Sequence, residues 1–455
     1  MGTLITEMKQ MQLFHTSMCP SSAADSLGEE ALRLEAKYSS ILSEAPQLAQ
    51  WVSFVGNKQV PLLRLYRYKE AFAWQFVSEF LQRFGLSDQD YVFDPFCGMG
   101  TTQFASYMHG IASIGVDRLP VAVFISSTLP KFLALQPGEL RETFERLRTR
   151  VHRAELAPIA EDVAIMKVAF PEAVLHRLRQ WKSAIDSLDG VFRDVFLLLF
   201  FSILEPCSYT SKDGQFLRLR RDKVVAEPDE ALAQKVSQAE RDLQIVRSTR
   251  WLGTTPVRPA PTPTVVLGDT RCLEGVAFDR KPTALITSPP YANRYDYTRT
   301  YSLELCFHFV RNFEEMRVLR HSLLRSHIEA RVEPHEEAPH PAVAEVVSLL
   351  RQRRRALNNP KIPDMLVGYF VDMEMAIREW ARVLATGAKV ALVVDNVRFD
   401  GVMLPVDLVL SEMAEQAGFR VDEILIARYK GNSSQQMGRY GRLPVRESVV
   451  LWSKR

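Results

Sequence analysis

The sequence lacks the features that mark membrane, secreted and metal-scaffold proteins. It has no apolar run of about 18 residues and no signal peptide, so nothing in it predicts a membrane span or export. Its five cysteines are scattered without a CxxC pair, which predicts reduced thiols and argues against a disulfide or zinc framework. It contains no internal repeat, and a net charge of +3 is too small to indicate nucleic-acid binding by itself.

The order of predicted elements indicates an α/β protein. Strands alternate with helices, which favours a doubly wound, mostly parallel sheet. The last two strands have no helix between them, so we expect them to pair antiparallel at the sheet edge. Strands are predicted at 91–93, 111–116, 264–267, 283–286, 390–394, 421–428 and 448–452, and helices at 26–42, 69–84, 103–109, 137–155, 172–207, 228–248, 366–385 and 406–417.

A glycine turn follows the first strand, in the segment FDPFCGMGTT that begins at Phe93. Glycines let the backbone pass close to a ligand, and the helix that follows offers free N–H groups. The second strand ends at Asp117, about 20 residues past the glycines, where a carboxylate is placed to accept from ribose hydroxyls. The alternative for Asp117 is a helix cap or a turn acid.

A second motif, TSPPY, ends the strand at 283–286. Two prolines cannot continue a strand ladder, so the strand stops at a rigid corner. The corner presents the Ser288 hydroxyl, the Pro289 carbonyl and, after Pro290, the ring of Tyr291. Two acceptors beside an aromatic face suit a planar ring that carries an exocyclic amino group. Pro-Pro-Tyr also occurs in ordinary loops and in polyproline ligands.

Two further places are candidates for cofactor contact. Tyr68 and Phe72 precede the first strand and would flank a cofactor, or else belong to a core stripe. Asp269 follows the strand at 264–267 and is placed to reach an adenine amino group.

Basic residues cluster locally although the total charge is small. Lys212 and Arg218 lie in a polar stretch of the insertion at 121–263. Arg294, Tyr295 and Arg299 lie just after TSPPY, and Arg353 and Arg354 belong to a run of arginines in a second insertion at 311–362. Such clusters suit phosphates and bases. The alternative is a solvated helix face.

FDPFCGMGTT followed by TSPPY resembles the S-adenosylmethionine-dependent amino methyltransferases of DNA. The resemblance implies a Rossmann-like methyltransferase fold with helical insertions, and a catalytic domain made of 61–120, 264–310 and 363–455 after an accessory segment at 1–60. It implies catalysis at Ser288, Pro289, Pro290 and Tyr291, with serine typical of the cytosine-N4 branch. For the cofactor S-adenosylmethionine it implies contacts from Tyr68, Phe72, Asp94, Pro95, Phe96, Gly98, Gly100, Thr101, Asp117 and Asp269.

The resemblance further implies double-stranded DNA as substrate, a base flipped out of the helix, direct methyl transfer without a metal, a cytoplasmic location and a restriction endonuclease as partner. Three alternatives stay open: adenine N6 as the target, an RNA or protein-amide substrate, and an inactive DNA-binding regulator. The insertion at 121–263 is the candidate target-recognition region, and 311–362 is the candidate DNA-contacting arm.

Overall fold

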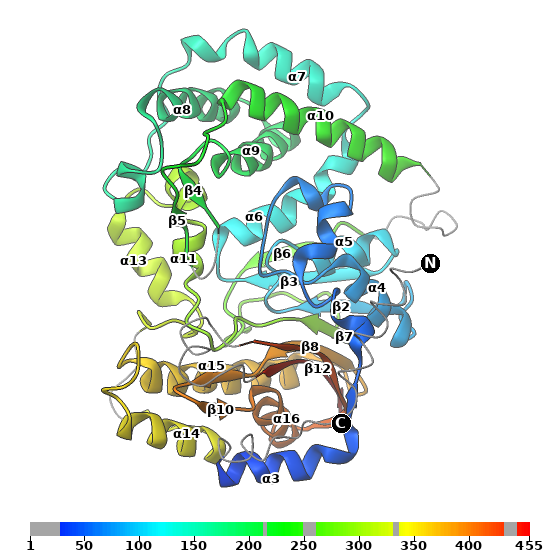
Figure 1. Cartoon of the computed structure of the whole chain (residues 1–455). Coiled ribbons are helices and arrows are strands. Elements are labelled where there is room, and N and C mark those ends of the chain that lie inside the picture. The colour runs from blue at the N-terminus through cyan, green and yellow to red at the C-terminus, as the bar shows by residue number, and fades with distance from the viewer. Residues whose placement is uncertain (1–27, 213–215, 249–260, 331–335, 432–443) are drawn as a thin grey trace, which may run out of the picture.

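The computed structural model describes residues 28–212, 216–248, 261–330, 336–431 and 444–455. Its centre is an eight-stranded sheet with the strand order β1-β11-β12-β8-β7-β2-β3-β6 (Figure 1). The pairs β8–β12 and β12–β11 are antiparallel, and the other pairs are parallel. The strands are β1 (Leu42–Glu44), β2 (Tyr91–Asp94), β3 (Ala112–Asp117), β6 (Thr264–Leu267), β7 (Ala284–Thr287), β8 (Lys389–Asp395), β11 (Phe419–Lys430) and β12 (Val445–Lys454). The expected fold class is confirmed.

Both faces of the sheet are covered, because its central strands alternate between two apolar cores. Ala284 and Ile286 of β7 face one core, and Leu285 between them faces the other. This period of two is what a pleated strand imposes. The first core contains α4 (Trp74–Arg83), α5 (Thr101–Met108) and α6 (Pro120–Thr128), and the second contains α3 (Glu29–Tyr38), α14 (Pro341–Gln352), α15 (Ile362–Val383) and α16 (Val406–Gln416).

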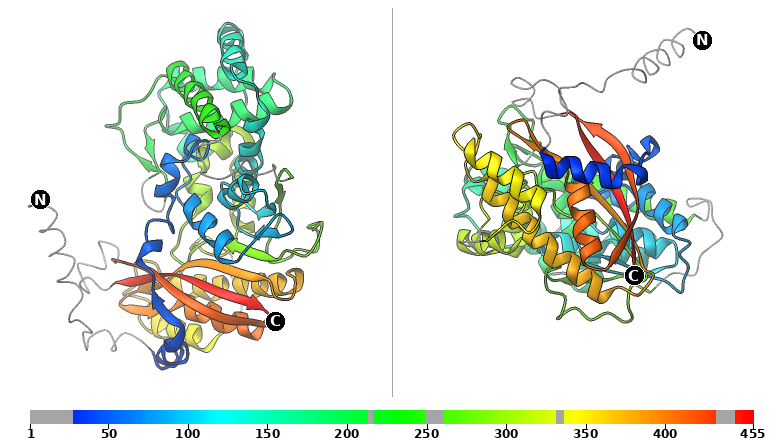
Figure 2. Two further views of the ribbon diagram at one scale, coloured as in Figure 1. Left: turned by 90° about the vertical axis from the view of Figure 1, so that its right-hand side faces the viewer. Right: turned by 90° about the horizontal axis from the view of Figure 1, so that it is seen from below.

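A second group of helices stands beyond the first core, at the top of Figure 1 and of the left view in Figure 2. It consists of α7 (Glu139–Arg148), α8 (Glu172–Asp186), α9 (Gly190–Leu204) and α10 (Pro228–Arg247), with a small hairpin of β4 (Thr210–Ser211) and β5 (Arg218–Leu219). Further short elements include α11 (Tyr297–Thr300), α12 (Ser302–Glu304), α13 (Phe313–Ser322), β9 (Val397–Phe399) and β10 (Val402–Leu404). The apolar helix α9 packs against α8 and α10, so this group shares the first core.

Several boundaries differ from the sequence-based expectation. The predicted helix at 172–207 is two helices, because the chain turns at Gly190, whose φ is +55°. The helix expected at 137–155 ends at Arg148. The final strands do pair antiparallel, but β11 is not the edge, since β1 pairs with it in parallel. The strand β1 was not predicted, because three residues are too few to show the alternating pattern of a strand.

The insertion at 311–362 also differs from the expected arm. Its helix α14 buries Val343, Val346 and Leu350 in the second core and contacts both α15 and α3. The arginine run follows directly at the end of this packed helix. The basic residues therefore follow a helix that is packed on the second core. In the part of the chain that is described, no helix is long and apolar enough to cross a membrane.

Candidate functional site

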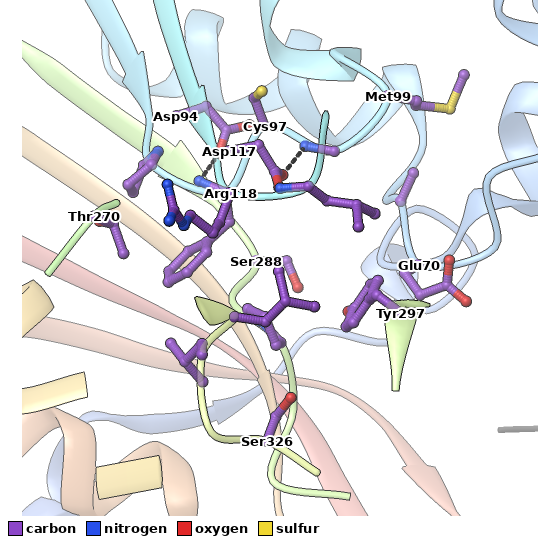
Figure 3. Close-up of a pocket in the computed structure, with 18 of the residues that line it drawn as sticks. Glu70, Asp94, Cys97, Met99, Asp117, Arg118, Thr270, Ser288, Tyr297 and Ser326 are labelled. Carbon is purple, nitrogen blue, oxygen red and sulfur yellow. Dashed lines mark hydrogen bonds between the residues drawn. The ribbon is translucent and has the colours of Figure 1, made fainter. Parts of the chain in front are cut away.

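One pocket opens at the carboxyl ends of β2, β3 and β7, where parallel α/β sheets bind ligands. Figure 3 shows Asp94 and Asp117 on one side of it, Glu70 and Tyr297 on another, and Ser288 between them. All but one of the predicted cofactor residues line this pocket, namely Tyr68, Phe72, Asp94, Pro95, Phe96, Gly98, Thr101, Asp117 and Asp269. The exception is Gly100.

Asp117 closes the glycine turn onto the tip of β3. One of its carboxylate oxygens accepts the Gly98 N–H at 2.9 Å, and the other accepts the Leu119 N–H at 2.9 Å. Burial raises the pKa of Asp117 to about 6, although these backbone hydrogen bonds act in the opposite direction. A carboxylate has about four lone-pair sites, so acceptor capacity is left over beyond these two bonds.

The two glycines of the turn serve different purposes. Gly98 has a φ of +51°, and a Cβ there would lie 3.2 Å from the ring of Tyr68, so the turn and this ring form a close cradle. Gly100 has a φ of +82°, and a Cβ there would lie 2.2 Å from Oγ of Ser126 on α6. The structure therefore gives Gly100 a packing role behind the pocket, where sequence reasoning placed a cofactor contact.

Asp94 joins the glycine turn to the second motif. Its Oδ1 accepts the Thr287 hydroxyl at 2.5 Å and the Phe96 N–H at 3.1 Å. Burial raises the pKa of Asp94 to about 7. This carboxyl links the ends of β2 and β7, and it therefore places Ser288 beside the turn.

The segment from Tyr68 to Phe72 lines the pocket as a loop with a turn at Lys69 and Glu70, whereas we expected a helix to begin at Lys69. The cause is Asn57, which donates to the Phe72 carbonyl at 2.8 Å and accepts the Trp74 N–H at 2.8 Å. These bonds delay the start of α4 to Trp74. The Tyr68 ring stacks on Tyr301, with 4.7 Å between the centroids, which holds it at the pocket.

Asp269 lines the pocket, but much of its acceptor capacity is already in use. Arg271 donates to both of its oxygens, at 2.9 and 2.6 Å, and also bonds Asp372 at 2.9 Å. Burial alone would raise the pKa of Asp269, but the hydrogen bonds and charge of Arg271 hold it below its usual value. The predicted contact of Asp269 with an adenine amino group stays a prediction.

A second pocket adjoins the first at the TSPPY corner. Four residues line both pockets: Glu70, Ala71, Ser288 and Tyr297. The second pocket is further lined by Pro289 and Tyr291, and by the ends of β8, β11 and β12. Pro290 lines the first pocket. A molecule in each pocket would thus meet the other beside Ser288.

A chain of hydrogen bonds runs from Ser288 into the sheet. The Ser288 hydroxyl donates to Tyr291 Oη at 3.4 Å, and the Tyr291 hydroxyl donates to Glu447 Oε1 at 3.2 Å. Lys430 bonds the same carboxylate at 2.6 Å, and its ammonium lies 5.5 Å from the centre of the Tyr291 ring. One face of that ring is therefore covered by a cation, and any stacking partner would take the other face.

Charged side chains of both signs line the second pocket. Its lining includes the carboxyl groups of Glu70, Asp395 and Glu447 and the cations of Lys69, Arg428 and Lys430. Burial raises the pKa of Asp395 to about 7 in spite of Lys430, which bonds it at 2.9 Å. Its Oδ1 is buried and has no partner within the described residues. A lining of both signs with a spare polar atom suits a neutral polar ring better than a free anion.

The predicted DNA contacts lie in different environments. Arg218, Arg353 and Arg354 are exposed, and the Arg299 side chain is 52 % exposed. Arg294 and Tyr295 are more enclosed, and Tyr295 lines the second pocket.

The predicted DNA contact of Lys212 is wrong, because this side chain is buried. It is only 2 % exposed, and its ammonium bonds Glu304 at 2.6 Å and Tyr66 at 3.0 Å. It neutralises a buried acid, so it does not reach the surface where DNA would lie.

Sequence reasoning missed Glu70, Tyr297, Asp395, Lys430 and Glu447. Glu70 lies between Tyr68 and Phe72, and Tyr297 lies between Tyr295 and Arg299. These neighbours were predicted site residues, so proximity in sequence was the signal that could have found Glu70 and Tyr297. Asp395 ends a predicted strand. No sequence motif marks Glu447 or Lys430. Only the antiparallel pairing of β11 and β12 brings these two residues to the TSPPY corner. Within the described ranges, no cluster of three or more His, Cys, Asp or Glu side chains could hold a metal ion.

Comparison with known proteins identifies relatives over nearly the whole length. The chain is 31 % identical to the type II methyltransferase M.BsoBI of Geobacillus stearothermophilus, over 93 % of this chain and 92 % of that protein. It is 32 % identical to the type II methyltransferase M.AvaI of a Nostoc strain, over 89 % of this chain and 88 % of the relative. No protein-family model matches. Among solved structures, an rRNA methyltransferase of Streptomyces viridochromogenes is 12 % identical, with a TM-score of 0.30 and coverage of 84 % and 85 %.

Proposed function

Because this chain belongs to the type II methyltransferases, we propose that it moves a methyl group from S-adenosylmethionine to the exocyclic N4 of a cytosine flipped out of double-stranded DNA. The observation that carries the proposal is that Ser288 borders both pockets. The first pocket suits the cofactor and the second suits the base. The methyl donor and the amino group would meet at this residue.

The first pocket fits a nucleoside cofactor. The Gly98 turn leaves backbone room, Asp117 offers acceptors to ribose hydroxyls, and the side chains of Tyr68 and Phe72 supply aromatic walls. S-adenosylmethionine supplies an electrophilic methyl group when it is bound. The chain then has to exclude water from that group and hold the acceptor nitrogen in line with it.

The TSPPY corner would supply the acceptors for the target nitrogen. The amino lone pair of cytosine is delocalised into the ring, which makes it a poor nucleophile. Hydrogen bonds from the two amino hydrogens to Ser288 Oγ and the Pro289 carbonyl would favour a more tetrahedral nitrogen and aim its lone pair. Because the Ser288 hydrogen is donated to Tyr291, the lone pairs of Ser288 remain for this purpose. The rate enhancement would come from positioning and fixed dipoles.

The face of Tyr291 opposite Lys430 would receive the flipped base. Stacking of a base on an aromatic ring is worth about 1–3 kcal/mol. Flipping costs a few kcal/mol, so stacking offsets much of it. Arg218, Arg299, Arg353 and Arg354 are the exposed cations that we propose contact DNA phosphates. A restriction endonuclease that reads the same site is the proposed partner.

The test is nucleoside mass spectrometry of DNA from cells that express the chain. We expect N4-methylcytosine from the wild type and none from the Ser288→Ala, Tyr291→Ala double variant. The matched control is Ser87→Ala, which lies at the far end of β2 from the site. N6-methyladenine in place of N4-methylcytosine would overturn the target atom and keep the active corner. Absence of both products with a folded, cofactor-binding protein would refute the DNA assignment.

A further inference from the structure

Glu447 ends the hydrogen-bond chain that starts at Ser288, although it lies on the C-terminal hairpin, far from TSPPY in sequence. It stands on β12, which is paired on one side with β8 and on the other with β11. Directly opposite it are Asp395 on β8 and Arg428 on β11. Glu447 is 1 % exposed, and its two oxygens take bonds from Arg428 at 2.5 Å and from Lys430 at 2.6 Å.

The two cations determine what this carboxyl can do. Arg428 and Lys430 donate to its two oxygens, and in every hydrogen bond that the structure gives the Glu447 side chain the carboxyl is the acceptor. The Tyr291 hydroxyl must therefore donate toward Glu447. Burial and the charge of Glu447 raise the pKa of Tyr291 well above its usual value, so the phenol keeps its proton.

The direction of the chain then follows by elimination. Since the Tyr291 hydrogen is used on Glu447, Tyr291 Oη is left as an acceptor for Ser288. Ser288 has a single hydroxyl hydrogen, and the bond to Tyr291 Oη uses it. Ser288 Oγ is thereby left with only lone pairs on the side where the target amino group would lie.

We propose that Glu447 is a positioning residue for methyl transfer, which acts through Tyr291 to keep Ser288 as a hydrogen-bond acceptor. The inference rests on the proposed function, because it assumes an amino group in the second pocket. It adds a role for the C-terminal hairpin, whose ion pairs would otherwise only join β11 and β12. The proposed role also explains why a buried carboxylate that bonds two cations accepts the hydrogen bond of the Tyr291 hydroxyl.

Glu447→Gln is the direct test, because glutamine keeps the shape and loses the charge. Its amide can donate to Tyr291 Oη, which turns the Tyr291 hydrogen toward Ser288 and the Ser288 hydrogen into the pocket. That hydrogen would oppose the amino hydrogens of the base. We expect kcat to fall by about tenfold or more, which corresponds to the loss of one hydrogen bond in the transition state. The Kd for S-adenosylmethionine should stay within about twofold of wild type, because Glu447 does not line the cofactor pocket.

A double-variant cycle separates this role from a structural one. Tyr291→Phe removes the middle of the chain and keeps the ring, so we expect a similar fall in kcat. Once Tyr291 is Phe, Glu447→Gln should cost no further activity, since it acts through the missing hydroxyl. The control is Asp407→Asn, another buried acid that is paired with an arginine, Arg446 at 2.6 Å. It should lower thermal stability and leave kcat unchanged.

The substrate is a duplex that contains a site methylated by the wild-type chain in cells. If Glu447→Gln lowers only thermal stability, as Asp407→Asn does, the positioning role is refuted. Additive losses of kcat in the double variant would refute it as well. Should Glu447→Gln fail to fold, Tyr291→Phe decides alone, and an unchanged kcat would overturn the inference. A wild type that methylates no DNA fails the proposed function itself, which is a separate result.

Discussion

Replacing Asp117 by asparagine should weaken cofactor binding with little change to the fold. The side chain keeps its shape, and its one remaining oxygen can still accept the Leu119 N–H. The amide nitrogen then faces the Gly98 N–H. The Gly98 N–H thereby meets a donor in place of the carboxylate oxygen that accepts its hydrogen bond at 2.9 Å in the wild type. The turn that closes over the cofactor loses one hydrogen bond, and the ribose loses a charged acceptor.

The size of the effect follows from these two losses. Both lost bonds are to the Asp117 carboxylate, and a hydrogen bond to a charged group is worth about 1.5–3 kcal/mol, of which we take the lower end because the pocket is open to solvent. Their sum of about 3 kcal/mol corresponds to about a hundredfold increase in Kd. Because the loss is in binding, saturating cofactor should restore most of kcat, so the defect should appear in KM.

Isothermal titration with S-adenosylmethionine measures this directly. The matched control is Asp90→Asn, whose carboxylate accepts the Ser87 N–H at 2.8 Å at the opposite end of β2. The control should bind the cofactor as wild type does. A Kd for Asp117→Asn within about threefold of wild type would refute the assignment of Asp117 as the ribose acid.

Three further predictions concern stability. Burial raises the pKa of Asp94 to about 7, so between about pH 4 and 7 the folded state binds a proton that the unfolded state has released. Stability should therefore fall as pH rises from about 4 to 7, and thermal melts should show a smaller fall for Asp94→Asn. Gly100→Ala should cost about 2–4 kcal/mol in urea unfolding, from its positive φ and the clash with α6. Gly85 also has a positive φ, but open space surrounds it, so Gly85→Ala should cost only about 1–2 kcal/mol. Equal costs for Gly100→Ala and Gly85→Ala would contradict the packing argument. Lys212→Met should cost about 3–5 kcal/mol by stranding Glu304, and adding Glu304→Gln should recover part of it. The slope of the logarithm of DNA affinity against the logarithm of salt concentration should be the same for Lys212→Met as for wild type. A slope that is smaller in magnitude by about one would show that Lys212 does contact a DNA phosphate.

Local signals in the sequence were sufficient for the fold class, the glycine turn and the TSPPY corner. The apolar strands stop at residues that cannot continue them, and the glycines stand where a strand runs into a helix, so each motif could be placed at a strand end. Since the carboxyl ends of parallel strands share one edge, the meeting of Asp94, Asp117 and Ser288 followed from the chain alone.

Long-range contacts decided the rest. Asn57 moves the start of α4 and turns Phe72 into a pocket wall, and Glu304 draws Lys212 into the interior. Neither effect leaves a periodic pattern, because each depends on one side chain from a distant segment. Glu447 reaches Tyr291 only because β12 pairs with β8, and β8 in turn pairs with β7, the strand that ends at the corner. The sequence determined which residues stand at the ends of the parallel strands, and tertiary pairing determined which distant side chains orient them, since pairing across 156 positions has no local signature.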